Sequence, residues 1–441
     1  AALHEPYVPP PEQRARIDEV RKQLVEARVE MLAGKYLPSL VAAQKCITTA
    51  REVGYEPFVA EAHWIRGSAL LATGNTDEAA QEYGEAVYTA IRSDHGDEAA
   101  NAAHSAAILA VSRGKPGEAK IWLGLAQAAA KRGGVDRDFE RTRLELDGLI
   151  AMEAGDLNAG VAAQEKALAM AEAELGKDSP MLYENESTLG TTLAKAGAYG
   201  KAAPHIERAL ALREASVGKE HPDIASLLTN LGACYTHTRE LAKAKPALER
   251  ALAIRERQYG KASPFLIATL DDYAELLRVS GDTAAAVATQ ERAVAIAKVV
   301  PGVENPMYQQ IATDYADTLV AANRLADARA LLIEVQAIEE KQQSAMLPTT
   351  LTSRAEVALA DHAWADAQTF ADRAIAGFEA AGGKDNPVLW RPLVARARVE
   401  LAQNHPQAAR PLLERALAIG EKGAVTEQDL APARELLAQL H

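Results

Sequence analysis

Residues 180–221 read PMLYENESTLGTTLAKAGAYGKAAPHIERALALREASVGKEH, and residues 222–263 read PDIASLLTNLGACYTHTRELAKAKPALERALAIRERQYGKAS. The two stretches align without a gap, and proline returns at the same interval at positions 264, 306 and 348. Self-similarity at a period of about 20–50 residues is typical of a solenoid, in which each module packs on its neighbours. Such a chain usually offers an extended binding surface instead of an enclosed active site.

The repeat divides each module into two helices separated by a break. Gly and Asn dominate the breaks because they adopt the left-handed conformation that ends many helices. Arg239 and His362 do not fit that reason, so we expect those two turns to close differently. The ten breaks fall at Gly34, Gly74, Gly114, Gly155, Gly197, Arg239, Gly281, Asn323, His362 and Asn404.

A column of small residues lies seven positions before each break. All ten members are Gly or Ala, and Gly232 is one of them. Gly within a helix costs about 1 kcal/mol relative to Ala, so helix propensity does not explain the column. We therefore expect close contact between the two helices of a module at these positions.

These patterns predict an all-α fold, a right-handed α-solenoid (superhelix) of about ten helical hairpins over residues 12–424. Residues 1–11 form a Pro-rich lead-in, and residues 425–441 a C-terminal capping helix. A capping helix is expected because the last apolar face has no neighbouring module.

Composition narrows the possible partners. The net charge is -13, from 48 basic and 61 acidic residues, which disfavours binding to nucleic acid. No apolar run reaches the length needed to span a bilayer, so we expect no direct membrane insertion of this chain. Two cysteines far apart in the sequence exclude a disulfide framework.

The module pattern resembles the tetratricopeptide repeat. The resemblance is carried by the small residue in the first helix, Ala in the second, Gly between them, and an aromatic residue or Leu two positions later, such as Tyr199 and Leu241. The 42-residue period and phrases such as Leu-Thr-Asn-Leu-Gly at 228–232 are similar to the long variant of kinesin light chains. The resemblance covers residues 12–441 and implies a protein-binding array.

A narrower resemblance concerns the first modules. Pro-Pro-Glu at 10–12, Gly-Tyr-Glu-Pro at 54–57 and Gly-Asn-Thr-Asp-Glu-Ala at 74–79 look like the C-terminal repeat region of myxobacterial-type serine/threonine protein kinases. That resemblance implies a bacterial signalling protein whose kinase domain, and often a membrane segment, precedes the repeats. The chain would then be cytoplasmic or tethered through that upstream segment.

The sequence offers no catalytic machinery. The Gly-rich loop, Val-Ala-Ile-Lys, His-Arg-Asp and Asp-Phe-Gly motifs of kinases are missing, so any kinase activity would reside upstream. Histidines and cysteines do not show metal-ligand spacing. We expect no enzyme activity, catalytic residue, metal or cofactor in this chain.

The inner, concave face is predicted from the small-residue column. In this repeat family, residues three before and one after the column line that face. The early modules then present apolar side chains, and the later ones carboxylates, which a basic segment of a partner would complement. The predicted partner-binding residues are Trp64, Ile108, Leu149, Asp271, Asp272, Glu275, Asp314, Asp317, Glu356 and Arg398.

We therefore expect a non-catalytic protein-protein interaction scaffold that binds a protein or peptide segment in its concave groove. On the kinase resemblance it would be the regulatory or sensing region of a larger serine/threonine kinase. The alternative is a stand-alone sensor of a short signalling peptide or a small molecule. An ordinary solvated acidic face also explains the carboxylates, and the oligomeric state stays open.

Overall fold

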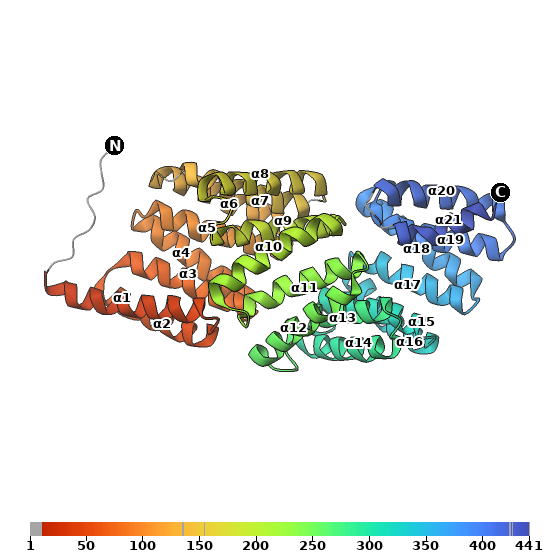
Figure 1. Ribbon diagram of the computed structural model, residues 1–441, viewed down its shortest axis with the longest axis horizontal. Coiled ribbons are helices and arrows are strands. Elements are labelled where there is room, and N and C mark those ends of the chain that lie inside the picture. The colour runs from red at the N-terminus through yellow and green to blue at the C-terminus, as the bar shows by residue number, and fades with distance from the viewer. Residues whose placement is uncertain (1–10, 135, 154, 423–424, 426, 441) are drawn as a thin grey trace. The chain divides into compact units, whose positions relative to one another are not determined.

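The computed structural model describes residues 11–134, 136–153, 155–422, 425 and 427–440. Within these ranges the chain is helical throughout and contains no strand (Figure 1). The fold class expected from the sequence, an all-α solenoid of stacked hairpins, is confirmed. The predicted lead-in lies outside the described residues except for Pro11, with which the first helix begins.

Helices pair in chain order as ten hairpins, followed by one further helix. The first five hairpins are α1(Pro11–Leu32) with α2(Tyr36–Val53), α3(Glu56–Ala72) with α4(Thr76–Arg92), α5(Gly96–Ser112) with α6(Pro116–Gly133), α7(Asp136–Glu153) with α8(Leu157–Leu175), and η1(Pro180–Leu182) and α9(Tyr183–Lys195) with α10(Tyr199–Val217). The next five are α11(Pro222–His237) with α12(Leu241–Tyr259), η2(Pro264–Leu266) and α13(Ile267–Val279) with α14(Thr283–Ala297), α15(Pro306–Ala321) with α16(Leu325–Gln342), α17(Leu347–Ala360) with α18(Trp364–Gly382), and η4(Pro387–Leu389) and α19(Trp390–Ala402) with α20(Pro406–Lys422). A π-helical turn, η3(Lys298–Gly302), precedes α15, and α21(Glu427–Ala438) follows α20.

The chain divides into two compact units. The first unit comprises residues 1–192 and 208–223, and the second comprises residues 193–207 and 224–441. Small residues fill much of each core: Ala43, Ala86 and Ala126 are fully buried in the first unit, and Ala251 and Ala293 in the second. Apolar residues at helical spacing therefore provide the driving force for stacking, because each module buries its faces on its neighbours.

Each of the ten breaks has a positive φ angle. Arg239 has φ 64° and His362 has φ 58°, close to the 76° of Gly197. The expectation that these two turns close differently is therefore wrong. Only Gly and Asn adopt the left-handed conformation at low cost, so the hairpin geometry must impose it on Arg239 and His362.

The small-residue column is explained by contact between paired helices. A Cβ atom placed on Gly232 would lie 2.4 Å from Cγ of Leu248, and one on Gly67 would lie 2.8 Å from the ring of Tyr83. Both distances are shorter than any real contact between carbon atoms. The absent side chain thus lets the second helix of the module approach the first, which offsets the poor helix propensity of glycine.

A Glu-Arg pair recurs in the second helices at 207–208, 249–250, 291–292 and 414–415, and its arginine has a structural role. Arg292 pairs with Glu256 of the preceding hairpin at 2.7 Å, and its guanidinium also donates to the carbonyl oxygen of Lys261 at 2.8 Å. Arg415 repeats both contacts, with Glu379 at 2.6 Å and with the Lys384 carbonyl at 2.8 Å. This part of the repeated phrase therefore ties successive hairpins together.

Several helices begin with a Ser or Asn residue whose side chain caps the helix start. The side chains of Ser179, Ser263, Asn305 and Asn386 each accept a hydrogen bond from the backbone N–H two residues later. Such caps satisfy donors that a helix start leaves without a partner. At the other end of the chain, Leu430 of α21 is buried in one cluster with Leu413 of α20, so α21 covers the last hairpin.

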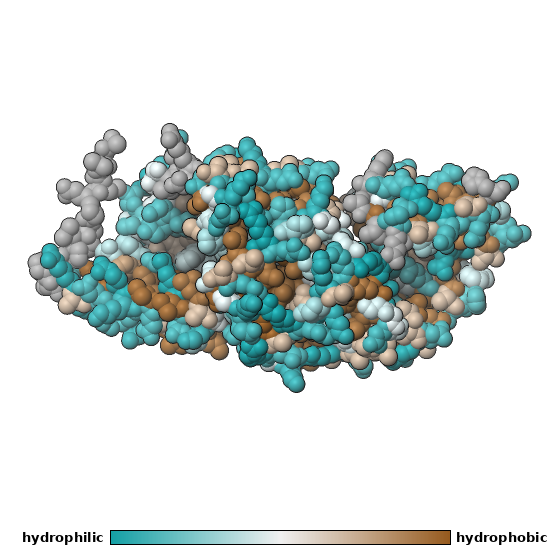
Figure 2. All heavy atoms as spheres, in the orientation of Figure 1, coloured by the Kyte–Doolittle hydropathy of each residue, from teal (hydrophilic) through white to brown (hydrophobic). Residues whose placement is uncertain are grey.

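On the face drawn in Figure 2, hydrophilic residues predominate and hydrophobic ones form small scattered patches. Among the described helices, none is both long and apolar enough to cross a membrane.

Candidate functional site

The predicted apolar residues of the inner face lie on the first helices of three successive hairpins. Trp64 on α3 is partly buried, and its indole N–H donates to the Ser105 hydroxyl at 2.9 Å. Ile108 on α5 is 38% exposed, and Leu149 on α7 is half-buried. We call the face that carries these residues the apolar inner surface.

Two hollows run along this surface and share His104. The first, of about 370 Å³, is lined by Trp64 and by Glu98 and Asn101 of α5. The second, of about 320 Å³, is lined by Ile108, Leu149 and residues of α9, among them Tyr183. Because His104 borders both, the surface is continuous from α3 to α9.

His104 is poised to meet a ligand as a neutral side chain. Burial, with a smaller contribution from the Arg141 charge, lowers its pKa to about 4. Its Nδ1 atom is buried and has no hydrogen-bond partner among the described residues. A buried polar atom without a partner costs free energy, which a bound hydrogen-bonding group would recover.

Carboxylates surround the two hollows. Glu98 and Asp97 share a hydrogen bond, and burial together with this bond raises the pKa of Glu98 to about 7. Glu145 accepts hydrogen bonds from Arg141 at 2.6 Å and from Asn185 at 2.5 Å, while burial raises its pKa. Carboxylates in an apolar setting favour a cationic partner, because only an opposite charge offsets their loss of hydration.

The predicted carboxylates of the second unit also gather on first helices. Asp271, Asp272 and Glu275 lie on α13, Asp314 and Asp317 on α15, and Glu356 on α17. We call these six residues the carboxylate cluster. Arg398, the predicted cation, is exposed on α19 and lies within electrostatic reach of Glu356.

The chain itself supplies two of the cations that we expected from a partner. Arg391 of α19 donates to Asp317 at 2.9 Å and to both oxygens of Glu356 at 3.1 Å. Arg278 donates to both oxygens of Glu275 at 2.6 Å. Half of the carboxylate cluster is therefore neutralised within the fold.

Of the other three carboxylates, Asp271 and Asp314 each accept a hydrogen bond from a side-chain amide. The Gln290 amide donates to Asp271 at 2.6 Å, and the Gln310 amide donates to Asp314 at 2.9 Å. Burial raises the pKa of Asp271, Asp272 and Asp314 to about 7 in each case. For Asp314 the neighbouring Asp271 charge acts in the same direction.

Sequence reasoning missed Arg391, Tyr183 and Arg141. All three lie six or seven positions before the small-residue column of their helix, one turn away from the positions that were counted. Residues three to four apart share a helix face. Extending the inner face by one turn toward the helix start would have found them.

Neither a candidate metal site nor a reactive thiol is found among the described residues. In the parts of the chain that the structure describes, no group of three or more His, Cys, Asp or Glu residues could hold a metal ion. Cys46 and Cys234 are buried, and burial raises the pKa of both thiols to about 12, which makes them poor nucleophiles.

Family models match this architecture. One model of the tetratricopeptide repeat matches residues 182–257, 223–298 and 346–422, and a second model of the same repeat matches residues 42–95. Together they cover more than half of the chain. The chain belongs to the tetratricopeptide-repeat family. No curated protein matches it by sequence.

Two solved structures of Rap proteins share the fold at low sequence identity. A Rap protein complexed with competence and sporulation factor has a TM-score of 0.54 at 13% identity, over 78% of this chain and 100% of that chain. The Rap conjugation gene regulator of plasmid pLS20, in complex with the Phr* peptide, has a TM-score of 0.51 at 16% identity, over 68% and 79%. The repeats of a putative kinesin light chain from Podosopora anserina are 22% identical over 45% of this chain and 94% of that chain, with a TM-score of 0.40.

Proposed function

We propose that this tetratricopeptide-repeat chain is a non-catalytic scaffold that binds a segment of another protein on its apolar inner surface. The segment carries apolar side chains that enter the two hollows and at least one Lys or Arg side chain. The observation that carries the proposal is the continuous surface from α3 to α9, with a partnerless His104 nitrogen at its centre.

Charge favours a basic segment over an acidic one. Besides Arg28, the first hollow is lined by three carboxylates, those of Glu61, Asp97 and Glu98. The second is lined by Glu145 and Glu184 and by no Lys or Arg among its described residues. Complementary charge raises the rate and the specificity of association, and the apolar walls supply most of the affinity.

Peptide selection on the purified chain tests the proposal. A displayed library should yield peptides that combine Leu, Ile or Phe with Lys or Arg. Ile108→Asp should weaken their binding by at least about tenfold, since it places a charge in the apolar wall. Ile121→Asp is the matched control, because Ile121 on α6 is 67% exposed and lies outside both hollows.

Selected peptides that lack cations, or an Ile108→Asp variant that binds as well as the wild type, would contradict this assignment. Measuring the affinity at pH 6 and pH 8 adds a second criterion. A cation next to Glu98 must displace a proton when the pH is below the pKa of about 7, so binding should strengthen toward pH 8.

A sensor of short peptides is the second candidate. It is favoured by the two Rap structures of similar fold, one in complex with the Phr* peptide and one with competence and sporulation factor. On this alternative, a free peptide of a few residues reaches full affinity and raises the melting temperature of the chain without a protein partner. A requirement for a longer folded partner would favour the scaffold.

The link to a kinase rests on the resemblance of the first modules alone. We propose that the chain serves as the regulatory region of a serine/threonine kinase whose catalytic domain lies upstream. The reading frame preceding Ala1 decides this, since it must encode a Gly-rich loop and the His-Arg-Asp and Asp-Phe-Gly motifs. A frame without those motifs would refute the kinase assignment and leave the peptide-binding proposal intact.

A further inference from the structure

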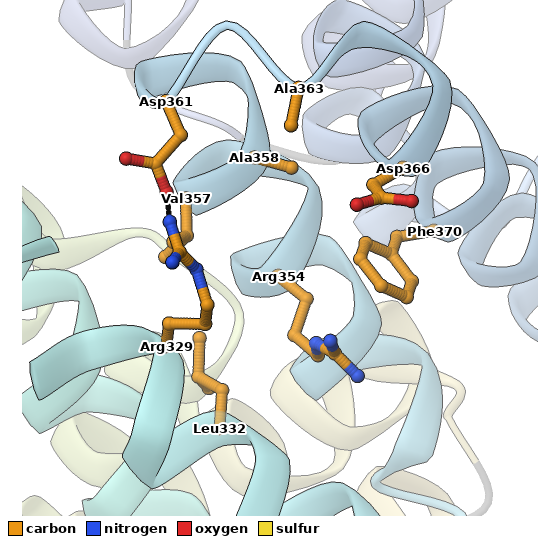
Figure 3. Close-up of a pocket in the computed structure, with 9 residues that line it drawn as sticks. All are labelled: Arg329, Leu332, Arg354, Val357, Ala358, Asp361, Ala363, Asp366 and Phe370. Atoms are coloured by element: carbon orange, nitrogen blue, oxygen red, sulfur yellow. Dashed lines mark ion pairs between the residues drawn. The ribbon is translucent and has the colours of Figure 1, made fainter. Parts of the chain in front are cut away.

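A third hollow opens in the second unit between α16, α17 and α18 (Figure 3). Its volume is about 410 Å³, within the range of small-molecule sites. Arg354 and Glu356 are two residues apart on α17, so they point about 200° apart around the helix. The hollow therefore faces away from the carboxylate cluster. It is lined by Arg329, Leu332, Arg354, Val357, Ala358, Asp361, Ala363, Asp366 and Phe370.

Arg354 is the unusual residue of this hollow. Its guanidinium lies 4.0 Å from the centre of the Phe370 ring and donates to the side-chain oxygen of Gln336. No carboxylate in the described part of the chain forms an ion pair with it. Arg329 of α16, by contrast, forms an ion pair with Asp361 at the end of α17, as the dashed line in Figure 3 marks.

The next module shows how an arginine at this position can be paired with carboxylates. Arg396 occupies the same position in the repeat, one residue before the small-residue column. It pairs with Asp372 at 2.9 Å and with Glu400, four residues later on the same helix, at 2.6 Å. The repeat register places Ile333 and Ala358 at the two corresponding positions of Arg354. Both carboxylates are thus replaced by apolar residues, and the hollow lies where one of them would be.

The charges of Asp366 and Glu340 attract the Arg354 guanidinium without forming an ion pair with it, so this partly buried arginine can still accept an external anion. Burial lowers the pKa of Arg354, which shows that its surroundings only partly replace its hydration. A carboxylate from outside would form the paired hydrogen bonds for which a guanidinium is shaped.

The other charges of the hollow limit that anion to a single negative charge. Arg329 and Asp361 neutralise each other, and Asp366 lies beside Phe370 (Figure 3). The formal charges of the four charged side chains in the lining sum to zero. Two of the four are carboxylates, which would repel a doubly charged phosphate more strongly than a singly charged anion. Leu332, Val357 and Phe370 offer apolar surface to the rest of the ligand.

We propose that this hollow is a binding site for a low-mass monocarboxylate, with the carboxylate on Arg354 and an apolar body against Phe370 and Val357. This site is separate from the apolar inner surface, and the inference goes beyond the proposed peptide binding.

Titration calorimetry of the full chain with phenylacetate tests the proposal. One equivalent should bind saturably, and 2-phenylethanol, which has a similar shape without the charge, should bind at least about tenfold more weakly. Inorganic phosphate should not compete. Phosphate binding that equals or exceeds phenylacetate binding, or no saturable binding of phenylacetate at millimolar concentrations, would overturn the proposal.

Two variants connect the binding to Arg354. Arg354→Gln removes the charge and should weaken phenylacetate binding at least about tenfold. Ala358→Glu restores the carboxylate that Glu400 provides in the next module. It should abolish binding and raise the melting temperature of the ligand-free chain, because Arg354 gains an internal partner.

Arg396→Gln is the matched control, since it changes the equivalent arginine one module later and should leave phenylacetate affinity unchanged. Unchanged affinity in both Arg354→Gln and Ala358→Glu would refute the assignment. The selected peptides of the inner surface should bind these variants normally, so failure of this proposal is distinguishable from failure of the first.

Discussion

The early and the late hairpins of this chain are joined in two different ways. In the first three hairpins the breaks recur about every 40 residues, and a single left-handed residue leads directly into the next helix, as at Gly54 with φ 74° and ψ 28°. In several later hairpins the period is 42, and the turn begins with an extended glycine, as at Gly260 with φ 82° and ψ 163°. A Ser or Asn cap and a proline follow that glycine.

The difference shows how two added residues change the contacts between modules. The longer turn exposes a backbone carbonyl next to its glycine, and the Arg of the Glu-Arg phrase binds it, as Arg292 binds Lys261. In the early hairpins a side-chain ion pair, Arg113 with Asp77, also joins successive hairpins. The later hairpins therefore add a contact with the backbone of the turn to side-chain ion pairs of the kind found in the early hairpins.

The largest loss of stability is expected at the small-residue column, where the paired helices of a module are in close contact in both regions. Gly232→Leu should destabilise the chain by about 3 kcal/mol, because even its Cβ atom would lie 2.4 Å from Leu248. Gly124→Ala is the control, since Gly124 of α6 has open space around it, and it should be neutral or stabilising. Denaturant unfolding measures both, and equal stabilities would show that the column is not a packing constraint.

The two turn types should respond differently to alanine. Gly260→Ala should cost about 2 kcal/mol, because the conformation with positive φ and extended ψ is available almost only to glycine. Gly54→Ala should cost about 1 kcal/mol, and Gly54→Asn less, since Asn tolerates the left-handed region. Thermal unfolding of the three variants would contradict the distinction if Gly260→Ala proved the mildest.

The pH dependence of stability should report on the buried carboxylates of the carboxylate cluster. Asp271 and Asp314 have pKa values raised to about 7 in the folded chain, so their protonated forms contribute stability that is lost as the pH rises through 7. The double variant Asp271→Asn and Asp314→Asn should therefore raise the melting temperature at pH 8 by about 2–4 °C and change it little at pH 5.

The charges that act on this pair are those of Asp272, Glu275, Asp317 and Arg391. Glu165→Gln, at an exposed position on α8, should leave the pH profile unchanged. A double variant whose melting temperature still falls between pH 5 and pH 8 as the wild type does would assign the effect to other groups.

The smallest loss of stability is expected from replacing the arginines that link successive hairpins. Arg292→Gln should cost about 0.5–1 kcal/mol, because it loses both the Glu256 pair and the Lys261 carbonyl. Arg113→Gln should cost less, since its partner Asp77 is 83% exposed. Raising the salt concentration should reduce the effect of Arg113→Gln more than that of Arg292→Gln, and the reverse order would contradict the proposed backbone tie.

Much of the architecture could be read from the sequence, because its determinants are local. The helix starts at Ser179 and Asn386, the turn glycines and the contact at Gly232 each depend on residues within one module. Counting from the column predicted Trp64, Ile108 and Leu149 as partner-binding residues; all three line hollows, and their role in binding stays a prediction. The sequence did not predict the left-handed conformations of Arg239 and His362, because the hairpin geometry overrides the intrinsic preference of these residues.

The sequence alone determined the repeat period, the helix pairs and the list of residues on each helix face, because all of these follow from spacing along one or two helices. Only the tertiary structure showed that Arg391 reaches Asp317 two hairpins earlier, that His104 joins two hollows, and that Arg354 forms no ion pair with a described carboxylate. Those facts depend on how modules stack in space, and the reach of a side chain across that stack is not encoded in any local pattern.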